Sequence, residues 1–128
     1  MTKTKVDFWL VGDIFEPDKI TNELDIKPTK ARLKKNSPIP QTAATYWKLS
    51  TEKEECTAIS EPFEKLVELL QNKESIIIKL CQQLGLTATF EVVIEMEIND
   101  RPELVLTKDI IQFANAIQAE IGFDLYID

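Results

Sequence analysis

Hydrophobic and polar residues alternate most regularly over residues 88–98, where every second side chain is apolar. These apolar residues are Ala88, Phe90, Val92, Ile94, Met96 and Ile98, and the positions between them are mostly threonine and glutamate. Because successive side chains of a strand point to opposite faces of a sheet, a period of two predicts a β-strand. One face of this strand is expected to be buried and the other mostly solvated.

Four further segments are predicted to be strands. Residues 5–11, 45–49 and 123–127 show the same alternation of apolar and polar side chains. Residues 103–106 follow the turn-forming sequence Asn-Asp-Arg-Pro, and we expect them to return as the hairpin partner of residues 88–98. The chain therefore predicts five strands.

Apolar residues spaced three or four positions apart predict the helices. The first covers residues 17–24 and begins with a proline, which suits the first turn of a helix. Residues 61–84 carry a longer pattern with an interruption, so both one kinked helix and two helices remain open. The last helix runs over residues 107–121, with Thr107 as its N-cap and Gly122 as its stop.

The resulting order of elements is β-α-β-α-β-β-α-β. This order matches a ferredoxin-like plan, in which residues 61–84 form an extra helical insertion between the two halves. We therefore predict a two-layer α+β fold with an antiparallel sheet and helices on one face. At 128 residues the chain is expected to form a single domain over residues 1–128.

The cellular setting is predicted from the cysteines and the apolar runs. Cys56 and Cys81 are the two cysteines, and the chain is long enough to fold without a disulfide, so reduced thiols are expected. No apolar run reaches the length of a membrane span, and the N-terminus does not have the pattern of a signal peptide. These features favour a cytoplasmic protein without a membrane partner.

Several kinds of chemistry lack the residues they require. The chain has no histidine, only three glycines and no C-x-x-C pair, which excludes triad catalysis, imidazole metal sites and glycine-rich phosphate loops. Glu91, Glu95 and Glu97 share one strand face and could hold a cation or act as an acid/base pair, but a solvated strand face is the favoured interpretation. We expect no enzyme activity, catalytic residue, metal or cofactor.

Charge is distributed unevenly along the chain. The net charge is −7, yet residues 27–35 contain five cations and no acid, so the remainder carries −12. The acidic field opposes binding to nucleic acid. Within the basic segment Lys30, Arg32, Lys34 and Lys35 could hold a phosphate or an acidic partner segment. A solvated loop that balances an acidic body is the alternative, and it is favoured because no glycine or aromatic residue is interleaved.

The sheet face opposite the core stripes is a candidate contact surface. Trp9, Val11, Val93 and Tyr126 are all predicted to lie there, among acidic residues. If their strands adjoin, these side chains form an aromatic patch with an acidic rim, which is typical of a protein contact surface. Alternatively, a helix or the proline-rich loop covers either ring. Trp47 is instead expected in the core.

The chain also resembles a known family through motifs spread over nearly its whole length. These are Phe8 with Gly12, the run Pro17-Asp18-x-Ile20-Thr21-x-x-Leu24-x-Ile26-x-Pro28-Thr29, Trp47-x-Leu49-Ser50, and the closing Asp124-Leu125-Tyr126. They are similar to the bacterial family called domain of unknown function 4279. Glu16, Asp25 and Asn36 depart from residues usual there, but each suits a cap or turn. The resemblance implies a small cytoplasmic protein without an assigned activity or site.

Three functional hypotheses follow. The main one is a non-enzymatic module that binds another protein, or a second copy of itself, through the face that carries Trp9 and Tyr126. One alternative is an immunity-type protein, whose acidic surface would neutralise a basic toxin. The other is a binder of small phosphorylated ligands that uses residues 27–35.

Overall fold

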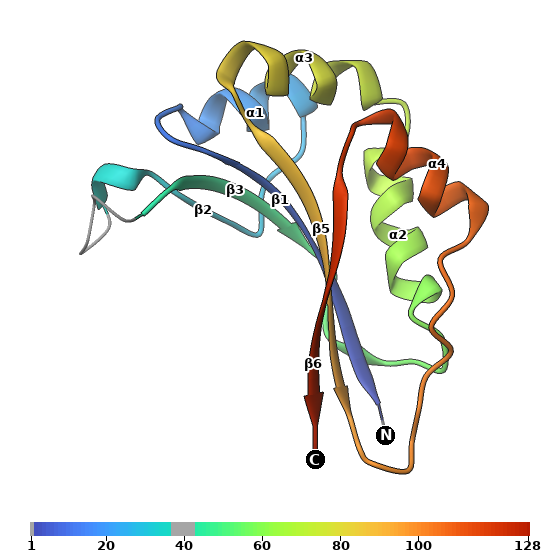
Figure 1. The fold of residues 1–128 in the computed structure, drawn as a ribbon. Helices are drawn as coiled ribbons and strands as arrows, with labels where there is room; N and C mark the ends of the chain where they lie inside the picture. The colour runs from blue at the N-terminus through green and yellow to red at the C-terminus, as the bar shows by residue number, and fades with distance from the viewer. Residues whose placement is uncertain (1, 37–42) are drawn as a thin grey trace.

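The computed structural model describes residues 2–36 and 43–128 (Figure 1). The strands are β1 (Lys3–Gly12), β2 (Lys30–Arg32), β3 (Thr45–Ser50), β4 (Glu54–Glu55), β5 (Thr87–Met96) and β6 (Glu120–Ile127). The helices are α1 (Pro17–Leu24), α2 (Ser60–Leu70), α3 (Glu74–Leu84) and α4 (Lys108–Ala116), with a short 3-10 helix, η1 (Lys34–Asn36). The described chain is thus a mixed α+β fold with one sheet of six strands and four α-helices.

β1 is the central strand of the sheet. The strand order is β2-β3-β1-β5-β6, and β4 pairs with the beginning of β1. β1 runs antiparallel to both β3 and β5, while β6 runs parallel to β5. The strand predicted over residues 88–98 is confirmed as β5. The prediction of a purely antiparallel sheet is wrong, because the sheet is mixed.

The sheet is mixed because the hairpin predicted after β5 does not form. Residues 103–106 do not pair with β5; Glu103 forms a single bridge to Ala58 instead. The chain then crosses through α4 before it enters β6, and a strand that returns through a helix can run parallel to its neighbour. The observed order is β-α-β-β-β-α-α-β-α-β, so the ferredoxin-like order is not confirmed.

The ends of the helices agree in part with the prediction. The helical pattern over residues 61–84 forms two helices, α2 and α3, and Asn72 between them has a left-handed backbone with φ of 68°. Thr107 is confirmed as the N-cap of α4, since its side chain accepts a hydrogen bond from the Ile110 backbone N–H. However, α4 ends at Ala116, and Gly122 lies inside β6 rather than at a helix end.

The core lies between the sheet and the helices, which cover the same side of the sheet in Figure 1. Phe8 is fully buried at its centre, with ring-centroid distances of 5.0 Å to Phe90 and 6.4 Å to Trp47. Trp47 is also fully buried, as expected. Cys56 and Cys81 are free thiols. Among the described residues, no helix has the length and apolarity needed to cross a membrane.

Candidate functional site

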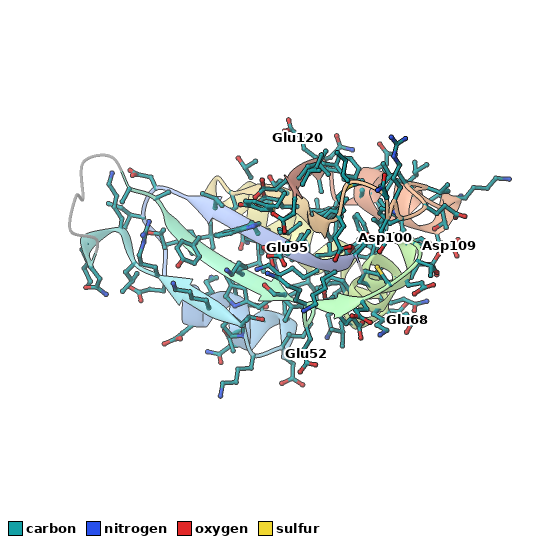
Figure 2. All side chains as sticks on the ribbon, turned by 90° about the horizontal axis from the view of Figure 1, so that it is seen from below. Glu52, Glu68, Glu95, Asp100, Asp109 and Glu120 are labelled. Carbon is teal, nitrogen blue, oxygen red and sulfur yellow. The ribbon has the colours of Figure 1, made fainter. Side chains whose placement is uncertain are left out.

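The side of the sheet that faces away from the helices carries most of the predicted site residues, and we call it the open face. In Figure 2 this face is seen from below, with Glu95 over the sheet and Glu120 at its edge. Period-two alternation places there the side chains that alternate with the core residues of β1, β3, β5 and β6. They include Asp7, Trp9, Val11, Tyr46, Lys48, Glu91, Val93, Asp124 and Tyr126.

One end of the open face combines cations with aromatic rings. Lys48 of β3 lies directly opposite both Lys30 of β2 and Trp9 of β1, and Arg32 lies opposite Tyr46. The Lys48 Nζ stands 4.8 Å from the centre of the Trp9 ring, and the Arg32 Cζ stands 5.0 Å from that of Tyr46. Both distances permit cation–π attraction. These five residues are called the basic half.

Two features of the basic half reduce the stability of the isolated fold. Lys30 and Lys48 place like charges directly opposite each other, which destabilises a strand pair by a few tenths of a kcal/mol to about 1 kcal/mol. In addition, the Trp9 Nε1 and the Arg32 Nε are buried donors that find no acceptor within the described residues. Leaving a buried donor unpaired costs about 1–3 kcal/mol. Packing of the fold alone therefore does not account for this arrangement.

The other side of the open face, across β1 on β5 and β6, is acidic. Glu91, Glu95, Glu120 and Asp124 lie there, and we call them together with Tyr126 the acidic half. The Tyr126 hydroxyl donates a 2.9 Å hydrogen bond to Asp124. That bond and the Asp124 charge, with smaller contributions from Glu91 and Glu95, raise the pKa of Tyr126. A phenol on this surface therefore experiences a negative field.

Lysines next to the acidic half neutralise part of its charge. Lys53 forms a 2.6 Å ion pair with Glu95, and this contact lowers the pKa of the Glu95 carboxyl. Closer to the middle of the sheet, the buried Asp7 carboxylate accepts a 2.5 Å hydrogen bond from the Ser50 hydroxyl and lies 3.5 Å from the Lys5 Nζ. Asp7 therefore separates the two halves as a satisfied, buried group.

The predicted single patch of Trp9, Val93 and Tyr126 does not form. Trp9 lies opposite Thr89, whereas Tyr126 lies opposite Glu95, six residues further along β5, which is about 20 Å at roughly 3.3 Å per residue. Trp9 contacts Tyr46 at a ring-centroid distance of 5.0 Å. All three residues share the open face, and Val93 is 9% exposed. The face is therefore divided by charge, with one aromatic group at each end.

The predicted basic loop is also divided. Lys30 and Arg32 belong to β2 and lie on the open face. Lys34 instead forms a 2.6 Å ion pair with Asp13, and together with Lys35 it lines a separate cavity of about 300 Å³ next to the exposed Ile14. Because the four cations do not converge, the loop does not present them to one small ligand.

Sequence reasoning missed two members of the basic half, Tyr46 and Lys48. Both alternate with Trp47, which was expected in the core, so period two already placed them on the opposite face. Their importance depends on the neighbouring strands. Because Lys30 and Trp9 come from segments that are remote in sequence, only the pairing of β2, β3 and β1 brings the cluster together.

The helical layer has a groove of its own. A cavity of about 500 Å³ lies between α2 and α4, and its lining includes Glu64, Glu68, Glu74 and Asp109 beside Val67 and Phe113. Figure 2 labels Glu68 and Asp109, which lie at the end of the molecule formed by α2 and α4. Across residues 2–36 and 43–128, no three carboxylate or thiol side chains are grouped in a way that could hold a metal ion.

Comparison with known proteins gives one match. A family model described as "Domain of unknown function (DUF4279)" matches residues 2–128. No curated protein and no solved structure matches the chain.

Proposed function

Since this chain belongs to the DUF4279 family, whose description names no activity, we propose its function from the open face: it is a non-enzymatic module that binds another protein there. The partner surface carries acidic groups opposite the basic half and basic groups opposite the acidic half. Such complementarity orients a partner and speeds its encounter with the module.

The observation that supports this proposal most strongly is the composition of the basic half. Lys30 and Lys48 repel each other across two strands, and the Trp9 indole N–H lacks an acceptor among the described residues. Local arrangements that oppose stability occur where function requires them. Carboxylates of a partner would lie between the two ammonium groups. Binding would then offset the repulsion between Lys30 and Lys48 that is present in the folded chain.

The shape and composition of the open face also favour a protein over a small molecule. Its two aromatic groups, at Trp9 and at Tyr126, lie roughly 20 Å apart along the strands, a span that a protein surface covers and a single metabolite does not. Aromatic residues and arginine, as in Trp9, Tyr46 and Arg32, are enriched at protein contacts. The helices leave this face uncovered (Figure 1).

Charge reversal at Lys48 tests the proposal. We expect affinity capture from the native cell at low salt to retain a partner on the wild-type chain and to lose it on Lys48→Glu. The matched control is Lys79→Glu, which makes the same charge change on the exposed side of α3 in the helical layer. Circular dichroism establishes that both variants are folded. Raising salt to about 0.5 M should weaken capture because screening shortens the reach of surface charges.

An identical set of captured proteins for the wild type and Lys48→Glu would remove the open face as the binding surface. A partner that is insensitive to Lys48→Glu but lost on Glu68→Lys would instead assign binding to the groove between α2 and α4. That second outcome is the one expected of an acidic immunity-type protein.

A further inference from the structure

β6 forms one edge of the sheet and lacks the proline and lysine residues that commonly protect an edge strand against pairing. Its outer side pairs with no other strand in the part of the chain that is described. Its sequence, EIGFDLYI, contains no proline and no lysine, the residues that natural edge strands use to prevent association. In Figure 1 the C-terminal part of β6 extends beyond α4 towards the chain end. The edge is therefore accessible over several residues.

The side chains on the helix side of β6 are apolar and uncovered. Phe123, Leu125 and Ile127 are paired with the core-facing Val92, Ile94 and Met96 of β5, yet they are 49%, 52% and 58% exposed. The alternation in this strand predicted a buried stripe. The helical layer ends before it reaches these side chains, so the stripe has no partner among residues 2–36 and 43–128.

The free backbone groups belong to the same residues. The Asp128 backbone N–H donates to the Met96 carbonyl at 3.0 Å, and the Asp128 carbonyl accepts from the Ile98 N–H at 3.1 Å, so both Asp128 groups face β5. Backbone direction alternates along a strand, so the N–H and C=O of Tyr126 and Asp124 also face β5. Those of Phe123, Leu125 and Ile127 face outwards, available to another strand.

We propose that β6 pairs antiparallel with β6 of a second copy of this chain, about a two-fold axis at Leu125. In this register Leu125 lies opposite the second copy's Leu125, and Phe123 lies opposite the second copy's Ile127. All three residues offer outward backbone groups, so each pair exchanges hydrogen bonds. The two-fold axis keeps both helical layers on one side, and the two apolar rows join into one.

The charges of β6 select this register. Its two acids, Glu120 and Asp124, lie on the open-face side of the strand. An axis at Leu125 places Asp124 opposite the second copy's Tyr126, and Tyr126 already donates to Asp124 within its own chain. An axis at Asp124 would place two carboxylates directly opposite each other, which is destabilising. An axis at Phe123 would leave the most exposed member of the row, Ile127, beyond the pairing.

The interface is small, so the dimer is reversible. Phe123, Leu125, Tyr126 and Ile127 are each about half exposed and contribute roughly 100 Å² apiece, or about 800 Å² for two copies before backbone is added. Stable interfaces bury about 1,200–2,000 Å². We therefore expect a dissociation constant on the order of micromolar or weaker. Pairing through β6 rests on the free edge and apolar stripe of that strand, whereas the proposed function rests on the basic half, so either can fail without the other.

Sedimentation over a concentration series tests the pairing. The wild-type chain is expected to shift from monomer towards dimer as concentration rises, whereas Leu125→Lys remains monomeric at the same concentrations. Ile14→Lys is the matched control, because it makes the same change at a residue that is 79% exposed and lies in the β1–α1 connection. Monomeric wild type at every concentration, or association of Leu125→Lys equal to that of wild type, would overturn the proposal.

Two further measurements test the register. In a Cys81→Ser background, mild oxidation should crosslink two copies of Leu125→Cys. In the proposed register residue 125 lies opposite residue 125 of the second copy, with about 5.5 Å between their Cα atoms. Phe123→Cys, which faces residue 127 of the second copy, should crosslink much less. Amide hydrogen exchange of Phe123, Leu125 and Ile127 should slow as concentration rises. Preferential crosslinking at position 123, or exchange independent of concentration, would contradict this register.

Discussion

Trp47 shows how a single buried residue connects elements that are far apart in the sequence. Its ring is fully buried against Phe8, and its Nε1–H donates a 3.0 Å hydrogen bond to the Thr21 hydroxyl of α1. A buried indole requires such an acceptor because an unpaired donor loses its hydration without compensation. This contact fixes α1 against β3 and therefore helps to hold the strand that carries Tyr46 and Lys48.

Replacing the acceptor tests this contact. Thr21→Val keeps the β-branched shape but removes the hydroxyl, so the Trp47 N–H is left buried without a partner. We expect the free energy of unfolding to fall by about 1–3 kcal/mol, measured by urea titration. Thr21→Ser retains the hydroxyl and should lose less. A Thr21→Val variant as stable as the wild type would show that the hydrogen bond to Trp47 contributes nothing.

At the scale of elements, the junction between α4 and β6 departs most from the helix pattern. Apolar spacing extends to Ile121, yet α4 ends at Ala116 and Gln118 takes a left-handed conformation with φ of 57°. Glutamine is unfavourable there because its Cβ approaches the backbone. This turn lets the chain leave the helix early and gives β6 its full length along β5.

Gln118→Gly is expected to raise the free energy of unfolding by about 0.5–1 kcal/mol. Glycine relieves the left-handed strain, and its greater freedom in the unfolded chain offsets part of that gain. Gln112→Gly is the matched control, because position 112 lies within α4, where glycine should lower stability by about 1 kcal/mol. Thermal or urea unfolding measures both. A loss of stability at position 118 would show that this turn is not strained.

At the scale of the whole molecule, the sheet is organised around β1, which is bonded on both sides. Residues 7–11 pair with β3 and with β5 at the same time. One edge of the sheet is β2, which has only three residues and pairs with β3 alone among the described strands. Local opening is easy where few bonds and little buried surface hold an element. The basic half therefore joins the most stable strand to one of the least stable.

Amide hydrogen exchange should reproduce this order. We expect residues 7–11 to exchange only through global unfolding and the β2 amides to exchange by local opening, orders of magnitude faster. Exchange followed by nuclear magnetic resonance, under conditions where reclosing is faster than chemical exchange, compares the two sets in one sample. Protection of β2 equal to that of β1 would mean that β2 is a more integral part of the fold than its single neighbour suggests.

The sequence by itself determined most of the local structure. Alternation identified β1, β3, β5 and β6, the spacing of apolar residues identified the helices, and Thr107 marked the start of α4, because these signals depend on neighbouring residues alone. It also placed Trp9, Val93 and Tyr126 on one face, since a period of two fixes the side of each residue. These conclusions needed no knowledge of which strands adjoin.

Only the tertiary structure decided the order and direction of the strands. It separated Trp9 from Tyr126 along the sheet, brought Lys30 against Lys48, and left Phe123, Leu125 and Ile127 uncovered at an edge. Each of these depends on pairing between segments that are remote in sequence, and alternation contains no information about register or neighbours. Whether an apolar stripe becomes core or surface likewise depends on how far the helices extend over the sheet. That extent is determined by residues outside the strand itself.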